Sequence, residues 1–175
     1  MQSALIQQRT KGSKSIQKIK IQRRLTPAQQ ADHLMKILAI AQHDDLRDVA
    51  FVEATLGIDL RKSTNEYGPS NKSVDFDGPW LNYRGKAPWA TLDIHYDPRQ
   101  SCLDMVFVPA VIGRPHNSGV DDLLFRDSRP EGEEHFFRYD YAQRHRTSLT
   151  FYSVDGCLTE ASLKQSAIYP NQLNK

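Results

Sequence analysis

The sequence predicts an α+β fold, in which an N-terminal helical hairpin packs on an antiparallel meander sheet of roughly four to six strands. Apolar residues recur with the period of a helix between residues 27 and 56, and with the period of strands between residues 74 and 165. Helices come first and strands follow, without the alternation typical of a parallel sheet. A chain of 175 residues, of which 39% are hydrophobic and 25% charged, suits one globular domain.

The first helix is predicted from residue 27 to residue 42. Thr26 is a suitable N-cap, Pro27 suits the first helical position, and Gln29 stands where a capping box places a glutamine. Four apolar residues then recur at the spacing of one helix face and predict a buried stripe. They are Leu34, Ile37, Leu38 and Ala41.

The second helix is predicted from residue 45 to residue 56, because Asp44 or Asp45 can accept hydrogen bonds from the amides of its first turn. Gly57 supplies a left-handed C-terminal stop. The apolar face of this second helix consists of Leu46, Val49, Val52 and Leu56, and is widened by Ala50 and Phe51. We expect the two helices to pack on the sheet through Leu34, Ile37, Leu38, Val49, Val52 and Leu56.

Strands are predicted at residues 74–77, 80–84 and 90–96. Residues 97–100 read as a turn with proline at its second position. The next alternating residues predict a return strand, and two more strands follow later in the chain. These three strands are marked by Leu103, Met105 and Phe107, by Phe137, Tyr139 and Tyr141, and by Leu149 and Phe151.

The last two strands, near residues 145–154 and 157–165, are predicted to form a hairpin around Asp155 and Gly156. An Asp-Gly pair favours a type I′ turn, in which both central residues need a positive φ. Cys157, Ala161 and Leu163 would then line the inner side of the final strand.

The charge distribution separates a basic N-terminal arm, residues 1–25, from a single α+β domain, residues 26–175. Residues 1–24 hold seven bases and no acid, which leaves 16 bases and 21 acids, a net charge of −5, in the remainder. The arm is typical of a segment that stays unfolded unless it docks, and residues 18–22 alternate as an added edge strand would. Nucleic-acid phosphates are a possible target of residues 9–24.

No apolar stretch is long enough to span a membrane, and none near the start resembles the apolar core of a signal peptide. The expected location is therefore the cytoplasm, with the periplasm as the alternative if a signal peptide has been removed. Cys102 and Cys157 match neither a metal spacing nor a CxxC motif. They are interpreted as two buried free thiols of a cytosolic protein, whereas a disulfide between them would indicate export.

Catalytic signatures are missing from the sequence. The six histidines show no HExxH or related spacing, so a metal site would have to be assembled across the fold, for example from Asp93, His95 and His135. There is no GxSxG elbow and no phosphate-binding glycine pattern. The sequence thus favours a protein that is not an enzyme, with no metal, no cofactor and no assigned catalytic residue.

The candidate partner-binding surface combines the long connection 109–134 with the strand that follows it. The connection is too long for a simple link, and only residues 120–125 within it suggest a helical turn. It is rich in acids, and the strand after residue 135 has aromatic residues on both faces. Acids speed encounter with a basic protein partner, while aromatics provide affinity. The predicted residues are Asp121, Asp122, Asp127, Glu131, Glu133, Glu134, Phe136, Phe137 and Tyr139.

Two short helices, the second ending in the stretch Val49–Ile58, followed by a meandering sheet resemble small bacterial immunity proteins. The resemblance covers the layout of residues 26–165. It implies a soluble, non-catalytic protein-binding module, an inhibitor that neutralises a bacterial toxin or effector. Two alternatives stay open: a small α+β enzyme with an unrecognised site, and a nucleic-acid-associated factor that uses the basic arm.

Overall fold

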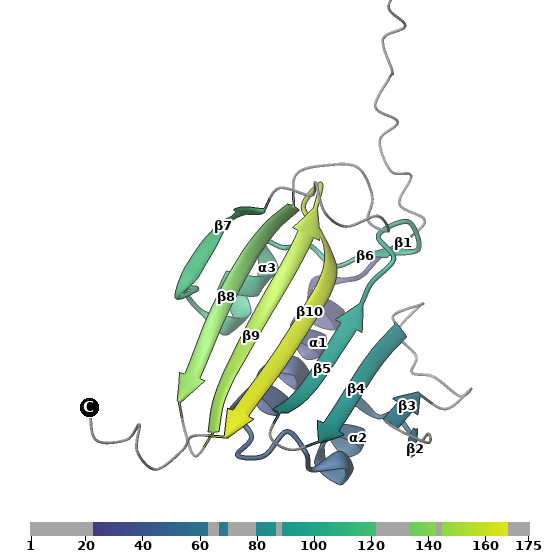
Figure 1. The fold of residues 1–175 in the computed structure, drawn as a ribbon. Coiled ribbons are helices and arrows are strands. Elements are labelled where there is room, and N and C mark those ends of the chain that lie inside the picture. Colours follow the sequence, from purple (N-terminus) through teal and green to yellow (C-terminus); the bar gives the residue numbers. More distant parts are fainter. Residues whose placement is uncertain are drawn as a thin grey trace, which may run out of the picture.

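The computed structural model describes residues 23–62, 67–69, 80–86, 89–121, 134–142 and 145–167. In this part of the chain, the helices lie together behind one face of a large antiparallel sheet (Figure 1). The helices are α1 (Pro27–Gln42), α2 (Val49–Leu56) and α3 (Phe107–Ile112). This arrangement confirms the predicted α+β class.

The sheet has eight strands within the described residues, in the order β2-β3-β4-β5-β10-β9-β8-β7. Every neighbouring pair is antiparallel. The strands are β2 (Leu60–Lys62), β3 (Tyr67–Pro69), β4 (Trp80–Lys86), β5 (Trp89–His95), β7 (Asn117–Asp121), β8 (Glu134–Ala142), β9 (His145–Val154) and β10 (Cys157–Ala167). Separately, β1 (Arg23–Arg24) pairs in parallel with β6 (Ser101–Cys102).

The strand order departs from a meander at one place. Strands β4 and β5 form a hairpin, and β7 to β10 follow one another across the sheet. Between these two parts, the chain passes from β5 through β6 and α3 to the far edge of the sheet. As a result, β10 returns to pair with β5 and lies in the middle of the sheet.

Helix α1 has the predicted bounds and the predicted capping box. Thr26 Oγ1 accepts a hydrogen bond from the Gln29 amide at 3.3 Å, and Gln29 Oε1 accepts one from the Thr26 amide at 2.9 Å. Two orphan amide groups at the helix start are thereby satisfied.

The buried stripe of α1 differs from the prediction at one residue. Leu38 is only half-buried, whereas Ile40 is fully buried with Leu34 and Ile37. The difference arises because the helix face that meets the rest of the fold also includes the buried residue His33. The stripe is therefore rotated away from Leu38.

Helix α2 starts later than predicted, at Val49 instead of residue 45. Asp48 is the N-cap and accepts a hydrogen bond from the Phe51 amide at 3.1 Å. Asp45 has a different partner, because its carboxylate accepts hydrogen bonds from the amide and guanidinium of Arg47. Gly57 ends the helix with a φ of 68°, as predicted.

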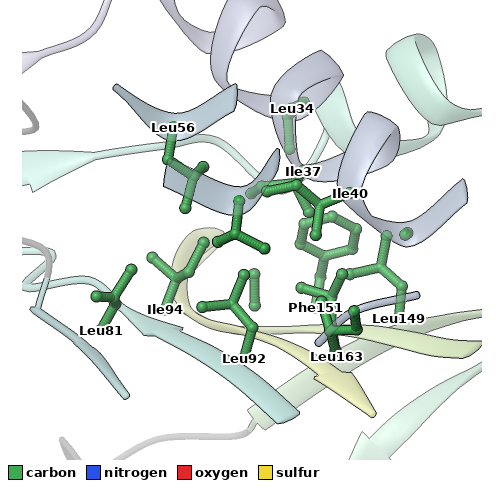
Figure 2. Close-up of a cluster of buried hydrophobic side chains, with 14 of the residues drawn as sticks. Leu34, Ile37, Ile40, Leu56, Leu81, Leu92, Ile94, Leu149, Phe151 and Leu163 are labelled. Carbon is green, nitrogen blue, oxygen red and sulfur yellow. The ribbon is translucent and has the colours of Figure 1, made fainter. Parts of the chain in front are cut away.

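The hydrophobic core lies between the helices and the inner face of the sheet (Figure 2). Leucine and isoleucine side chains from α1 and α2 meet apolar side chains of β4, β5, β9 and β10, which confirms the helix-on-sheet packing. The labelled core residues are Leu34, Ile37, Ile40, Leu56, Leu81, Leu92, Ile94, Leu149, Phe151 and Leu163.

The predicted C-terminal hairpin is present. Strands β9 and β10 pair in antiparallel register on either side of Asp155 and Gly156. Both turn residues have positive φ, 53° and 79°, as a type I′ turn requires. Cys157, Ala161 and Leu163 are buried as predicted.

The return strand predicted at residues 103–107 is wrong. Only Ser101 and Cys102 form β6, and residues 107–112 form α3. The apolar, β-branched composition of this segment suits a strand, but packing against α1 decides its conformation. Val120 likewise belongs to the edge strand β7 and not to a helical turn.

The interpretation of Cys102 and Cys157 as free thiols is also wrong, because the two residues form a disulfide. The segment after β6 lies beside the start of β10, where the Leu158 amide donates to the Leu103 carbonyl at 2.8 Å. This pairing brings the two cysteines together across 55 residues of chain. Both cysteines are buried.

Two expectations lie outside the described residues: the strand at 74–77 and the alternating segment 18–22 of the basic arm. None of the helices in the described ranges combines the length and the apolar character needed to cross a bilayer.

Candidate functional site

The candidate site is the sheet face that points away from α1, α2 and α3, called here the outer face (Figure 1). Strand β5 shows how this face arises. Ala90, Leu92 and Ile94 are buried toward the helices, whereas Thr91 and Asp93 between them are half-buried on the other side. The same alternation along β9 and β10 collects polar and aromatic side chains on the outer face.

Two side-chain pairs lie next to each other near the centre of the outer face. The register between β5 and β10 places Asp93 opposite Ser162 and His95 opposite Glu160. The Ser162 hydroxyl donates a hydrogen bond to Asp93 Oδ1 at 2.5 Å, and His95 Nδ1 lies 3.5 Å from Glu160 Oε2. The hydrogen bond fixes the direction of the Ser162 hydroxyl. The pairs form an ordered polar surface.

Aromatic rings extend the row that begins with His95 and Glu160 toward the β7 edge of the sheet. Tyr152 lies opposite Glu160 on one side and Phe136 on the other, and the two ring centroids are 6.5 Å apart. The Phe136 ring covers Gly119 so closely that a Cβ at that position would lie 2.9 Å from Phe136 Cε1. Gly119 therefore provides the space that the ring occupies on the edge strand.

The predicted partner-binding residues separate into four groups, the last of which is interior. Phe136 lies on the outer face and is half-buried, and Asp121 ends β7. Phe137 is half-buried on the opposite side, where it packs against the core. Four of the predicted residues, Asp122, Asp127, Glu131 and Glu133, lie outside the described residues.

Two predicted residues are interior. Glu134 is 1% exposed and Tyr139 is 2% exposed, so neither is available to a partner in this conformation. The Tyr139 hydroxyl donates a hydrogen bond to the Gly113 carbonyl at 2.9 Å, which ties β8 to the end of α3. Burial, with a smaller contribution from Tyr141, raises the pKa of Tyr139 to about 12. The predicted alternation of aromatics along β8 thus serves the core on one side and the outer face on the other.

The metal site considered from the sequence is not assembled. Asp93 and His95 lie on the outer face, whereas His135 precedes the outward-pointing Phe136 and therefore faces the other side of the sheet. In the described ranges, ligand atoms come close enough for a metal only in the group formed by Cys102, Asp104 and Cys157. The two sulfurs of that group are bonded to each other.

A polar pair formed by the buried His33 and the half-buried Tyr96 lies on the opposite side of the sheet. His33 Nε2 and the Tyr96 hydroxyl are joined by a hydrogen bond of 2.5 Å. Burial lowers the pKa of His33 to about 3, Lys36 lowers it further, and Asp32 opposes the change. Burial also raises the pKa of Tyr96 far above its ordinary value. Both groups are therefore neutral at physiological pH, and their hydrogen bond links α1 to the end of β5.

Sequence reasoning missed the outer-face residues of β9 and β10, including Tyr152, Glu160 and Ser162. The Asp-Gly turn predicts the register of the hairpin at its tip. A register shift between Leu158 and Glu160 then changes which residues point outward. No signal in the sequence marks this bulge, so the row could not be assigned.

Comparison of the chain with protein-family models, with curated proteins and with solved structures found no significant match.

Proposed function

We propose that this chain is a non-catalytic protein-binding module, an immunity or inhibitor protein that neutralises a bacterial toxin or effector. The observation that carries the proposal is the outer face, which presents aromatic side chains among ordered polar pairs. Tyr152 and Phe136 are half-buried on it, and Trp89 is 63% exposed. One exposed and two half-buried aromatics on this face favour protein recognition, because tyrosine and tryptophan dominate the energetics of protein interfaces.

The outer face also has the rigidity expected of a preformed binding surface. Its side chains stand on long, paired strands, and the contacts Ser162–Asp93 and His95–Glu160 restrict their rotation. Less conformational entropy is then lost when a partner binds. A basic partner, recognised through acids of residues 121–134, stays part of the proposal.

The disulfide supports a location in an oxidising compartment. Stable disulfides are rare in the cytosol and common in exported proteins. We therefore propose the periplasm, the alternative expected from the sequence, as the location, in place of the cytoplasm. Alkylation of free thiols in denaturant immediately after cell lysis, followed by mass spectrometry, tests this location, because the buried cysteines are accessible once the chain is unfolded. Cys102 and Cys157 are expected to resist alkylation until a reductant is added, whereas full alkylation without reductant would contradict the proposal.

The protein-binding function is tested by partner capture followed by reconstitution with the purified partner. Tyr152→Ala and Trp89→Ala are expected to increase the dissociation rate at least about fivefold, because truncation of an interface aromatic costs roughly 1–4 kcal/mol. Met35→Ala is the matched control, since Met35 is 51% exposed on α1, away from the outer face.

Neutralisation of the partner's toxicity in cells is the second readout. It is expected to fail with Tyr152→Ala and to persist with Met35→Ala. Equal effects of the control and the outer-face variants, or no effect of either, would contradict the proposal.

A further inference from the structure

The exposed side chains of the outer face become basic toward one end of the sheet. At this end, the lower one in Figure 1, β4 and β10 finish and β5 begins. Three basic residues from three different strands are exposed there: Arg84, Arg146 and Lys164. Trp89, 63% exposed, lies among them. These four residues are called here the cationic end.

The strand register places the cationic end on one surface. Lys164 pairs with Thr91, which pairs in turn with Arg84, so these two bases share a row. Trp89 pairs with Ser166, which pairs with Arg146, and this forms the next row on the same side. Neighbouring rows lie roughly 7 Å apart along the strands, and neighbouring strands roughly 5 Å apart. Long basic side chains from both rows can therefore reach one bound group.

Two of the bases form no salt bridge with another described residue. In the part of the chain that the structure describes, Arg146 and Lys164 form no salt bridge, unlike Arg138, whose guanidinium contacts Asp140 at 3.1 Å on the same face. Acidic side chains near the centre of the face are held by Ser162 and His95. The charges of Arg146 and Lys164 are thus available to an external anion, and Arg84 adds positive charge beside them.

We propose that the cationic end binds an acidic segment of the protein partner, with Trp89 packing against an apolar side chain of that segment. This inference rests on the proposed function and adds the chemistry of the partner at this end. Arginine and lysine attract and orient carboxylates, and a tryptophan among them provides buried apolar area. The partner therefore presents carboxylates here, whatever its charge opposite residues 121–134.

Two other anionic partners fit the described residues less well. Single-stranded nucleic acid needs several rings in reach of the bases. Here Tyr152 and Phe136 lie at the other end of the face and contact each other. A membrane surface needs more than one exposed apolar anchor. In the described ranges, the other large exposed apolar residues, Met35, Val106 and Val120, are not on this face.

The test measures binding of a labelled peptide of alternating glutamate and leucine to the full chain by fluorescence anisotropy. Labelled oligothymidylate of equal charge and vesicles containing phosphatidylglycerol are the comparison arms. Saturable binding of the peptide, tighter than that of the oligonucleotide and without binding to vesicles, is expected. The double variant Arg146→Gln/Lys164→Gln should weaken peptide binding at least about tenfold, and Trp89→Ala should weaken it several-fold.

The control is Lys36→Gln/Arg99→Gln, which changes the net charge equally. Lys36 lies on α1 and Arg99 in the turn after β5, each beside an aspartate. This variant should bind the peptide as the native chain does.

Equal weakening by the control, tighter binding of the oligonucleotide, binding to vesicles, or no peptide binding would each overturn the inference. Because the peptide assay does not use the natural partner, its failure leaves the Tyr152 test of the proposed function intact.

Discussion

The two faces of the same sheet use polar residues in different ways. On the inner face, Gln165 Oε1 accepts a hydrogen bond from the Leu46 amide at 2.7 Å, and its Nε2 donates to Thr147 Oγ1 at 3.0 Å. The Tyr83 hydroxyl donates to the Leu46 carbonyl at 2.7 Å. These contacts tie the connection between α1 and α2 to the sheet. On the outer face, polar side chains bond mainly to one another.

This difference separates stability from recognition. An inner-face polar group satisfies a buried backbone group, so its loss leaves that group without a partner in a dry environment. An outer-face group that loses its neighbour is hydrated instead. We therefore expect inner-face substitutions to lower the free energy of unfolding, and outer-face substitutions to change binding while the fold persists.

The largest expected effect comes from the disulfide on the inner side of the hairpin. Cys102→Ser/Cys157→Ser should lower the free energy of unfolding by about 4 kcal/mol, because the unfolded chain regains the entropy of a loop of 55 residues. Chemical denaturation of the variant and of the oxidised native chain measures this loss. An unchanged midpoint would show that the cross-link contributes nothing to stability.

A comparable or smaller effect is expected from two adjacent positions of α1. Ile37→Ala should cost about 2–5 kcal/mol, since Ile37 is fully buried and its truncation leaves a cavity. Leu38→Ala should cost clearly less, because Leu38 is half-buried. The same unfolding measurement decides between the observed stripe and the one predicted from the sequence. Equal losses at the two positions would favour the predicted stripe.

The third effect depends on pH. The folded state holds the pKa of His33 at about 3, below its ordinary value of 6.5, so the unfolded chain binds the proton more readily. The contribution of neutral His33 to the free energy of unfolding is complete above pH 6.5. It is lost as the pH falls toward 3, by about 1.4 kcal/mol per pH unit.

Urea unfolding of the native chain and of His33→Gln across this range tests the effect. In the variant, the free energy of unfolding should change less with pH over this range. A variant with the native slope would assign the pH dependence to other groups.

The smallest effects are expected from two substitutions on β10, one on the inner face and one on the outer face. Gln165→Leu should cost about 1–3 kcal/mol, because it leaves the Leu46 amide unsatisfied. Ser162→Ala should cost less than about 1 kcal/mol, because Asp93 is half-exposed and water can replace the hydroxyl. Melting temperatures of the two variants provide the comparison. A larger loss for Ser162→Ala would contradict the division of roles between the faces.

Local signals predicted the elements that depend on neighbouring residues. The capping box at Thr26, the stop at Gly57 and the turn at Asp155 and Gly156 each need only a few residues, and all three are confirmed. Periodicity predicted the strands around Leu92 and Tyr139 for the same reason.

Features that depend on distant contacts could not be predicted. Residues 107–112 form a helix because they pack on α1, and the two cysteines meet because the segment after β6 lies beside β10. The residues of the candidate site depend on distant contacts in the same way. Phe136 was identified by its alternation, but the row from His95 to Tyr152 requires knowledge that β10 pairs with β5.

Because β10 lies in the middle of the sheet, the sheet can complete its folding only after this strand has been synthesised. His95 pairs with Glu160, and contacts between residues so far apart in sequence form slowly. While the ribosome is still making the chain, β5 has no neighbour on one side, and the sheet is two separate fragments. Only the final long strand closes this gap. The nascent chain therefore stays incompletely folded until its last long strand has emerged.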